Sequence, residues 1–558
     1  MFRGKTKQKL YAKCYKGGQV YEQIQNRPYI LGISCFYYDS AICLVKDGEI
    51  LYAVQEERFS RKKHDPNFPL NSIRYCLKKE KIDINDLDFI GFYDNSFKNR
   101  FKILYELKKI NFRKKVIFFD KKTSYLASAF YPSYFKEAVI LVNDGDKVGL
   151  VLGRGKDNII EPIKNKDFNY SLGKLYSAIT HYLGFKENSD EYKVMGLSGY
   201  GKPKYKDLIL KNKDRLLNTS FKKINKVLEE ILDRPARKKD VEITEFHMDI
   251  ASSIQKATEE ETLKITEYLY KTTGCVNLCL SGQLALNCLI NSEILKQGFF
   301  KDIWIQPAST DAGCAVGVAF LIWYKYLNNK RIITDYQDKM KNAFLGPSYS
   351  DEEIENFLKS NGIPYKKLDY SVIPKITAEL IIKGNIVGWF QARIEFGPRA
   401  LGSRSILADS RNFQLKDRLN AKVKFREDFR PLAPTVLFEK KDEFFNLNRE
   451  SQYMLFVAEV KKDKINQIPA VTHIDNSSRI QTIKREQNPL YYDTIYEFYK
   501  ETGCPVIINT SFNTKDEPIV LTPQDAYRCF MRTEMDYLLM GSFLLDKKEQ
   551  RPIEKSLF

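Results

Sequence analysis

Four short clusters of polar residues in the last third of the chain carry side chains that suit phosphate chemistry. They lie within an apolar pattern of strands and helices and span 395–405, 422–431, 472–479 and 509–513. Arginine offers a planar fork that matches phosphate oxygens, lysine offers a compact charge, and serine and asparagine bind the remaining oxygens. Glycines, prolines and aromatic residues stand between these charges. The clusters therefore predict an anion and nucleotide site.

The first part of the chain predicts the strands and turns of a nucleotide-binding domain. A buried strand over 29–35 leads to Asp39 and Ser40, and strands over 41–46 and 49–55 flank an Asp-Gly turn typical of a hairpin. This order opens the actin-like fold, in which Gly and Asp at the turn face a phosphate. The same pattern of a strand followed by a polar turn recurs at 138–145, and the segment 276–282 is a third candidate for this pattern. Apolar residues at helical spacing predict a helix over 248–271, which Gly274 ends.

A connector at 344–350 marks the expected main domain boundary, because Asp351 then begins a helix with acidic residues in its first turn. The following part mixes strands with helices and predicts an α+β domain. The expected strands are 386–390, 505–509 and 537–540, and the expected helices are 489–502 and 523–533.

Composition narrows the class of protein. The chain has 558 residues, enough for two or three domains, and it holds no apolar run near the roughly 18 residues of a membrane span. The net charge of +19 comes from lysines spread along the chain, so nucleic acid is not the expected partner. Ten cysteines without a CxxC pair favour reduced thiols, and the N-terminus lacks an apolar signal core. We expect a cytoplasmic protein with no membrane partner.

Several segments, in order along the chain, resemble the nodulation-type O-carbamoyltransferases. These segments are 31–41 (LGISCFYYDSA), 55–65 (QEERFSRKKHD), 188–197 (NSDEYKVMGL) and 303–307 (IWIQP). The resemblance covers about residues 29 to 546 and implies α/β plus α+β architecture. It implies a basic extension at 1–28, an actin-like (ASKHA, TsaD-like) carbamoyl-transfer domain at 29–345 and a YrdC-like domain at 350–558.

The resemblance also implies a two-step reaction. The C-terminal domain converts carbamoyl phosphate and ATP to carbamoyl-adenylate, and the N-terminal domain passes the carbamoyl group to a hydroxyl or amine. Carried over by position, the catalytic residues are Lys424, Arg430, Ser477, Arg479 and Asp39. The nucleotide-binding residues are Arg399, Arg404, Asn509, Ser511, Asn513, Gly282 and Asn287.

The N-terminal domain departs from the family pattern at its metal site. The family segment HHxSHAASAF, whose first and fifth residues bind a metal, typically iron, aligns here with 121–130, so Lys121 and Tyr125 replace both histidines. Asp144 and Asp311 remain and favour Mg²⁺ over Fe²⁺ as a ligand set. Tyr38 replaces another family histidine, and Gly282-Gln283 replaces a Gly-Gly pair. Either Tyr38 or Tyr125 would act as an acid or base only if its pKa were lowered toward neutrality.

These observations favour an ATP-dependent carbamoyltransferase that acts on a sugar or secondary metabolite. Two alternatives stay open: a family member with altered transfer or ligation chemistry, and a non-catalytic nucleotide-binding scaffold. Pyrophosphate release separates the enzymes from the scaffold. The acceptor itself is not predicted, and a homodimer is expected only from the resemblance.

Overall fold

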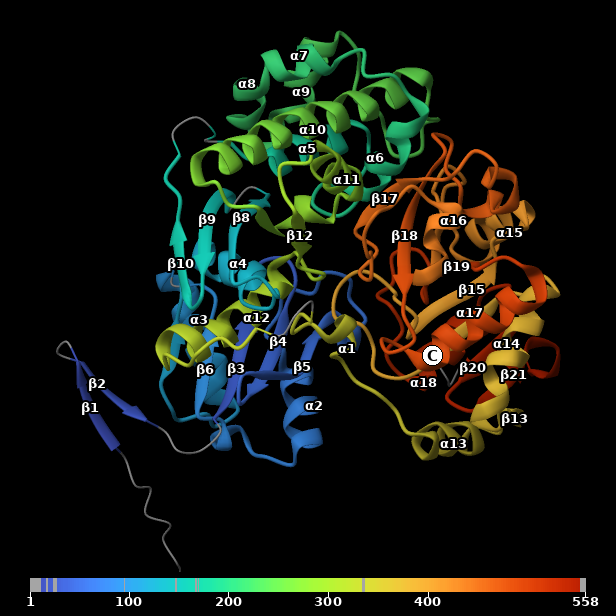
Figure 1. The fold of residues 1–558 in the computed structure, drawn as a ribbon, viewed down its shortest axis with the longest axis horizontal. Coiled ribbons are helices and arrows are strands. Elements are labelled where there is room, and N and C mark those ends of the chain that lie inside the picture. Colours follow the sequence, from blue (N-terminus) through green and yellow to red (C-terminus); the bar gives the residue numbers. More distant parts are fainter. Residues whose placement is uncertain are drawn as a thin grey trace, which may run out of the picture.

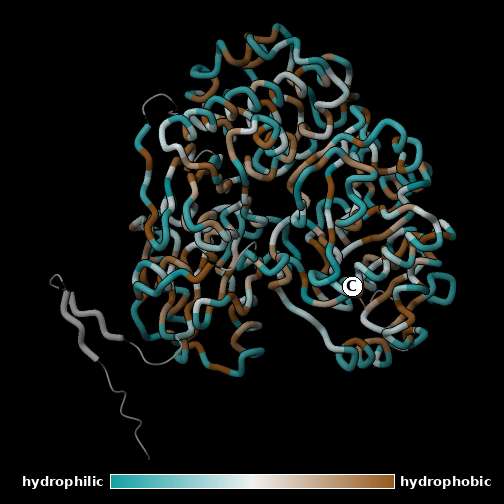
Figure 2. Tube along the Cα trace, in the orientation of Figure 1, coloured by the Kyte–Doolittle hydropathy of each residue, from teal (hydrophilic) through white to brown (hydrophobic). Residues whose placement is uncertain are grey.

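The computed structural model describes residues 12–16, 19–23, 28–94, 96–145, 148–165, 168, 170–333 and 337–551 (Figure 1). Within the expected N-terminal extension, β1 (Ala12–Lys16) pairs antiparallel with β2 (Gln19–Gln23). Hydrophobic stretches of the trace lie mainly in the strands inside the molecule, and the outer loops are mainly hydrophilic (Figure 2). In the described part of the chain, every helix is too short or too polar to cross a bilayer.

Two five-stranded sheets share one topology. Their orders are β5-β4-β3-β6-β7 and β10-β9-β8-β11-β12, and in each the central strand has an antiparallel hairpin on one side and two parallel strands on the other. The first sheet comprises β3 (Tyr29–Ser34), β4 (Ala41–Lys46), β5 (Glu49–Gln55), β6 (Phe89–Phe92) and β7 (Val116–Phe118). The second comprises β8 (Glu137–Asp144), β9 (Gly149–Lys156), β10 (Ile159–Pro162), β11 (Asn277–Ser281) and β12 (Asp302–Ile305).

The predicted hairpin and its recurrence are confirmed by these sheets. Asp47 and Gly48 both have positive φ, as a tight hairpin turn between β4 and β5 requires. The third predicted unit, 276–282, is β11 and pairs in parallel with β8 instead of opening a new sheet.

Two helices lie between the sheets, α4 (Lys121–Phe130) and α12 (Asp311–Phe320). They can approach closely because small residues line the contact. A Cβ on Gly32 of β3 would lie 2.0 Å from a carbonyl of α12, and one on Gly317 would lie 2.2 Å from the Ser124 carbonyl of α4. This close packing places the N-terminus of α12 beside α4 and the turn after β3. Of the residues expected at the metal site, Lys121, Tyr125 and Asp311 belong to these two helices, and Asp144 is the last residue of β8.

The remaining helices of this part lie around the sheets. They are α1 (Glu57–Ser60), α2 (Leu70–Glu80), α3 (Phe97–Lys109), α5 (Leu172–Tyr182), α6 (Glu191–Leu197), α7 (Lys206–Lys211), α8 (Lys213–Leu217), α9 (Phe221–Leu232), α10 (Glu245–Thr273) and α11 (Cys288–Gln297). The predicted helix over 248–271 is confirmed as α10, which begins after Thr244 and ends at Gly274 with φ 64°.

The C-terminal part is built on one nine-stranded mixed sheet of order β13-β21-β20-β14-β15-β19-β16-β18-β17. Its strands are β13 (Lys366–Lys367), β14 (Val387–Phe390), β15 (Arg404–Asp409), β16 (Ala433–Leu437), β17 (Phe456–Glu459), β18 (Ser477–Ile483), β19 (Val506–Ser511), β20 (Tyr537–Met540) and β21 (Phe543–Asp546). Its helices are α13 (Asp351–Ser360), α14 (Ile373–Ile382), α15 (Phe413–Arg418), α16 (Lys441–Phe444), α17 (Pro489–Thr502) and α18 (Pro523–Met531). All five predicted elements of this part are present, with bounds that shift by at most two residues.

Candidate functional site

A cavity of about 360 Å³ lies between the C-terminal sheet and the elements around the first two sheets. Its walls come from distant parts of the chain. One wall carries Tyr38, Asp39 and His64, and another carries Tyr192 and Met195 of α6. The facing wall is supplied by the four polar clusters that the sequence singles out, and it includes Arg399, Lys424, Arg430, Arg479, Asn509 and Ser511. The predicted clusters thus meet at one site.

Positive charge dominates the C-terminal wall. Burial lowers the pKa of Arg399 to about 9, and the nearby charge of Arg479 adds to this effect. Burial likewise lowers the pKa of Arg479. The Nε atoms of both arginines are buried without a hydrogen-bond partner among the described residues. An anion between them would supply both the missing charge and the missing acceptors.

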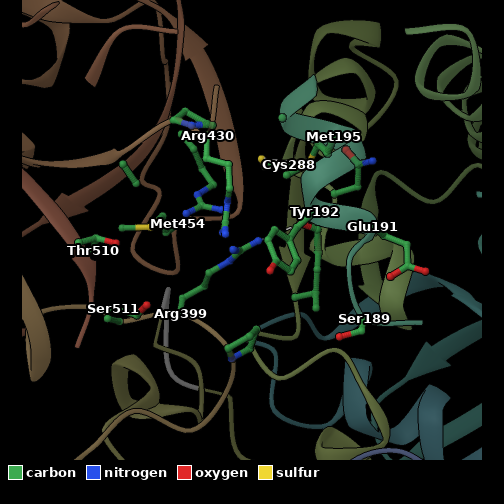
Figure 3. A pocket seen from close by; sticks show the side chains of 18 of the residues that line it. Ser189, Glu191, Tyr192, Met195, Cys288, Arg399, Arg430, Met454, Thr510 and Ser511 are labelled. Atoms are coloured by element: carbon green, nitrogen blue, oxygen red, sulfur yellow. Dashed lines mark hydrogen bonds between the residues drawn. The ribbon is translucent and has the colours of Figure 1, made fainter. Parts of the chain in front are cut away.

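Arg430 reaches the cavity from the same wall and lies against the opposite one. Its guanidinium is 4.6 Å from the ring centre of Tyr192, and Figure 3 shows Arg430 and Arg399 directed toward that ring. Such stacking fixes a guanidinium without using its N–H donors. Arg430 also lies 3.9 Å from the carboxylate of Glu427, which is a loose ion pair.

Lys424 is buried and is held by oxygens of the chain itself. Its Nζ donates to the carbonyls of Ser511 at 2.7 Å and Asn513 at 2.6 Å, and it also contacts Asn513 Oδ1 at 2.6 Å. Burial lowers its pKa well below the usual range, and the nearby charge of Arg426 adds to this. In this structure Lys424 organises the loop after β19. The predicted direct contact with phosphate would require it to exchange some of these bonds.

The predicted residues Ser477, Asn509, Ser511 and Asn513 all line the cavity, and their side chains also hydrogen-bond to other residues of its wall. Asn509 lines the cavity, and its Nδ2 donates to Gln481 Oε1 at 2.8 Å and Thr435 Oγ1 at 3.1 Å, while its Oδ1 is buried without a partner among the described residues. Ser477 donates to Asp475 at 2.6 Å. Although burial opposes it, hydrogen bonds from His473 and Ser477 lower the pKa of Asp475 to about 2.

Asn287 and Gly282 belong to the second sheet's side of the site. Asn287 lines the cavity and caps α11, because its Oδ1 accepts the amide of Ile290. Gly282 does not line the cavity. Its φ is 88°, and a Cβ there would lie 2.4 Å from the Asn143 carbonyl, so glycine is required by a backbone contact between β11 and β8. The next residue, Gln283, lines the cavity instead.

Arg404, predicted as a member of the same pocket, lies outside the cavity lining and is fully buried. Its guanidinium donates to the carbonyls of Gln391, Ala392 and Ser403 and lies 3.7 Å from the ring centre of Phe390. Burial lowers its pKa to about 10. Arg404 therefore supports the backbone beside β14 and has no access to a ligand in this cavity.

Asp144 and Asp311 form a buried carboxylate pair beside the cavity. Asp311 accepts hydrogen bonds from the Tyr125 hydroxyl at 3.0 Å and the Tyr38 amide at 3.2 Å, and Asp144 accepts the Gln283 amide at 3.1 Å. Burial and the charge of Asp311 raise the pKa of Asp144 to about 7, while the Lys121 ammonium opposes this rise.

These residues do not fit the metal site that the family resemblance implies. In place of two imidazole ligands, the site offers a phenol, whose pKa is raised well above its usual range by burial, and a cationic lysine. The expected pairing of Asp144 with Asp311 as metal ligands lacks a third ligand side chain among the described residues. Burial also raises the pKa of Tyr38. Neither tyrosine is therefore tuned to act as a base at neutral pH.

Asp39 belongs to a cluster of side chains whose contacts were not predicted from the sequence. His64 Nδ1 lies 2.9 Å from Asp39 Oδ1, and the His64 amide donates to Glu57 at 2.7 Å. Glu57 also pairs with the adjacent Arg58. His64 stacks on Tyr38 with ring centres 4.2 Å apart. The charged run 61–65 (RKKHD) makes His64 noticeable in the sequence, but the pairing of His64 with Asp39 depends on the tertiary fold.

Comparison with known proteins decides the family. The carbamoyltransferase N-terminus model matches residues 29–106 and 92–320, and the carbamoyltransferase C-terminus model matches residues 378–547. The chain belongs to the carbamoyltransferase family. It is accordingly an enzyme of the transferase class, and the nodulation-type resemblance seen in its sequence is confirmed.

Relatives of similar length support this assignment. The uncharacterized protein sll1178 of Synechocystis sp. is 43% identical over 94% of this chain and 97% of its own length. Nodulation protein NolNO of Sinorhizobium fredii is 36% identical over 93% of this chain and 80% of its own length. Nodulation protein NolO of Bradyrhizobium diazoefficiens is 37% identical over 75% of this chain and 77% of its own length.

Proposed function

We propose that this carbamoyltransferase makes carbamoyl-adenylate from carbamoyl phosphate and ATP and transfers the carbamoyl group to a hydroxyl or amine of a small-molecule acceptor. The observation that carries the proposal is the arginine-lined cavity shared by the two parts of the chain. Buried Arg399 and Arg479 have no ion-pair partner among the described residues, and carbamoyl phosphate and the phosphates of ATP would supply the matching anions.

The first step fits the C-terminal wall. Water cleaves carbamoyl phosphate, releasing phosphate and leaving carbamate, and a carbamate oxygen then attacks the α-phosphorus of ATP and expels pyrophosphate. Arg399, Arg430 and Arg479 would neutralise the charge that accumulates on these phosphate oxygens. Tyr192 holds Arg430 in place by stacking.

The second step, transfer of the carbamoyl group to the acceptor, would use the opposite wall of the cavity, which carries Asp39 and His64. The acceptor oxygen or nitrogen attacks the carbamoyl carbon, adenylate leaves with the C–O bond electrons, and the acceptor proton goes to a base. The Asp39–His64 pair is the candidate for that base, because a carboxylate at 2.9 Å orients the imidazole and stabilises its protonated form. No step is assigned to a metal at Asp144 and Asp311, because the residues there do not fit one.

We also make proposals about the fold of each part, the cellular compartment, the acceptor and the oligomeric state. The repeated sheet topology supports an actin-like fold for residues 29–345. We further propose a YrdC-like fold for residues 350–558, a cytoplasmic enzyme, a sugar or secondary metabolite as acceptor, and a homodimer.

The test is pyrophosphate release from ATP, with and without carbamoyl phosphate, in the absence of acceptor. Wild type should release pyrophosphate only when carbamoyl phosphate is present. Arg479→Ala should reduce this release at least about a hundredfold, the scale of losing one oriented donor to a developing charge. Arg485→Ala, whose side chain is 65% exposed and pairs with Asp493 at the surface, is the matched control. Carbamoyl-phosphate-independent release would favour altered ligation chemistry, and no release even with acceptor extracts would favour a non-catalytic scaffold.

A further inference from the structure

Helix α3 (Phe97–Lys109) exposes an apolar face to solvent. The exposed fractions are 78% for Phe97, 60% for Phe101, 45% for Leu104 and 61% for Tyr105. Positions i, i+4, i+7 and i+8 lie on one side of a helix, so these four side chains form one continuous stripe. The opposite side of α3 packs on the protein through buried residues. The exposed stripe is therefore additional to the face that holds the helix in the fold.

Basic residues surround this apolar stripe. The segment 97–115 contains eight lysines and arginines and a single acidic residue, Glu106. All eight basic side chains are exposed. Lys108 continues the stripe one turn beyond Leu104 and Tyr105, and Lys98 lies on its flank. An exposed helix with an aromatic stripe and a basic border is typical of helices that lie in the plane of a membrane surface.

We propose that α3 docks on an anionic lipid bilayer. The aromatic and leucine side chains would enter the boundary between head groups and acyl chains, and the lysines and arginines would extend to the acidic head groups. A second copy of the chain is a poorer occupant, because a two-fold interface would place each basic border against its own equivalent. Docking of this kind requires no membrane-spanning segment. A membrane surface would then be a partner, in contrast to the expectation that was drawn from the absence of such a segment.

The position of α3 connects this surface to the cavity. Asn99 Nδ2 donates to the Tyr37 hydroxyl at 2.8 Å, and the Lys102 ammonium lies 4.0 Å from the ring centre of Phe36. The turn that α3 contacts continues directly into Tyr38 and Asp39, which line the cavity. On the proposed function, docking would bring the transfer side of the site close to the bilayer. The docking itself does not depend on that function.

Vesicle sedimentation tests the proposal independently of catalysis. The probes are vesicles of phosphatidylcholine alone and of phosphatidylcholine mixed with phosphatidylglycerol. Wild type should bind the mixed vesicles and leave the neutral ones unbound. Phe97→Ser combined with Phe101→Ser should weaken binding by more than about tenfold. The triple variant K98Q/K108Q/K115Q should weaken it by about a hundredfold, as expected for removing three charges near an anionic surface.

Matched controls separate docking from general effects. Phe413 is 52% exposed at the start of α15, and Phe413→Ser should bind vesicles like wild type. K222Q/K223Q/K226Q removes three exposed charges from α9 and should also leave binding unchanged. Unchanged thermal unfolding would show that each variant is folded. The proposal is overturned if wild type does not bind the mixed vesicles, if the serine variant binds as well as wild type, or if that variant instead dissociates a dimer.

Discussion

The buried pair of Asp144 and Asp311 makes the stability of this protein depend on pH in an unusual direction. Burial and the charge of Asp311 raise the pKa of Asp144 from 3.8 to about 7, so the folded protein holds a proton that the unfolded chain releases near pH 4. Stability contributed by this group is therefore present at low pH and is lost as pH rises from about 4 through about 7. Above that range the Asp144 carboxylate is charged in the folded protein.

The magnitude follows from the size of this shift. Each pKa unit corresponds to about 1.4 kcal/mol, so a shift of about three units costs the folded state up to ~4 kcal/mol near pH 8 and ~2 kcal/mol near pH 5. Asp144→Asn removes the charge and keeps an oxygen that can accept the Gln283 amide. The variant should therefore gain stability over wild type, by ~2 kcal/mol more near pH 8 than near pH 5.

Urea denaturation of both proteins at these two pH values measures the difference. Asp463→Asn changes a carboxylate whose side chain is 74% exposed, and it should leave the pH dependence as it is in wild type. If Asp144→Asn changes the free energy of unfolding equally at both pH values, the carboxylate pair is not buried and coupled as the structure indicates.

Three further variants test other parts of the structure. Gly317→Ala should destabilise the fold by about 3 kcal/mol or more, since its methyl group would lie 2.2 Å from the Ser124 carbonyl; an unchanged melting temperature would contradict the close packing of α12 on α4. Wild type should bind no stoichiometric iron or zinc by elemental analysis after dialysis, whereas K121H/Y125H should gain a metal. Metal bound equally by wild type would contradict this prediction and would point either to this site without the histidines or to Asp39, Glu57 and His64, whose ligand atoms lie within 4.8 Å of one another. His64→Gln should leave pyrophosphate release unchanged and lower carbamoyl transfer about a hundredfold; equal loss of both activities would rule out a role confined to transfer.

Local pattern predicted the elements of this fold well. The Asp47-Gly48 turn, the long helix that ends at Gly274 and the helix that begins at Pro489 each carry a residue type that the local backbone requires, so their positions were visible in the sequence. The four polar clusters were also visible. They stand out because charged residues interrupt otherwise apolar strands.

Contacts between distant segments could not be predicted in this way. Arg404 has the residue type of a phosphate ligand, but its guanidinium is bound by carbonyls of the preceding loop. Lys424 likewise meets oxygens that lie almost ninety positions further along the chain. The pairing of Asp39 with His64 depends on how the turn after β3 meets the segment after α1. Residue type alone identifies a possible ligand, and only the fold decides whether it faces the cavity.

Pyrophosphate release measures the formation of carbamoyl-adenylate in the arginine-lined cavity. We expect release from ATP that requires carbamoyl phosphate, needs no acceptor, falls at least about a hundredfold in Arg479→Ala and persists in Arg485→Ala. Release that is independent of carbamoyl phosphate, or equal in Arg479→Ala and wild type, would contradict it.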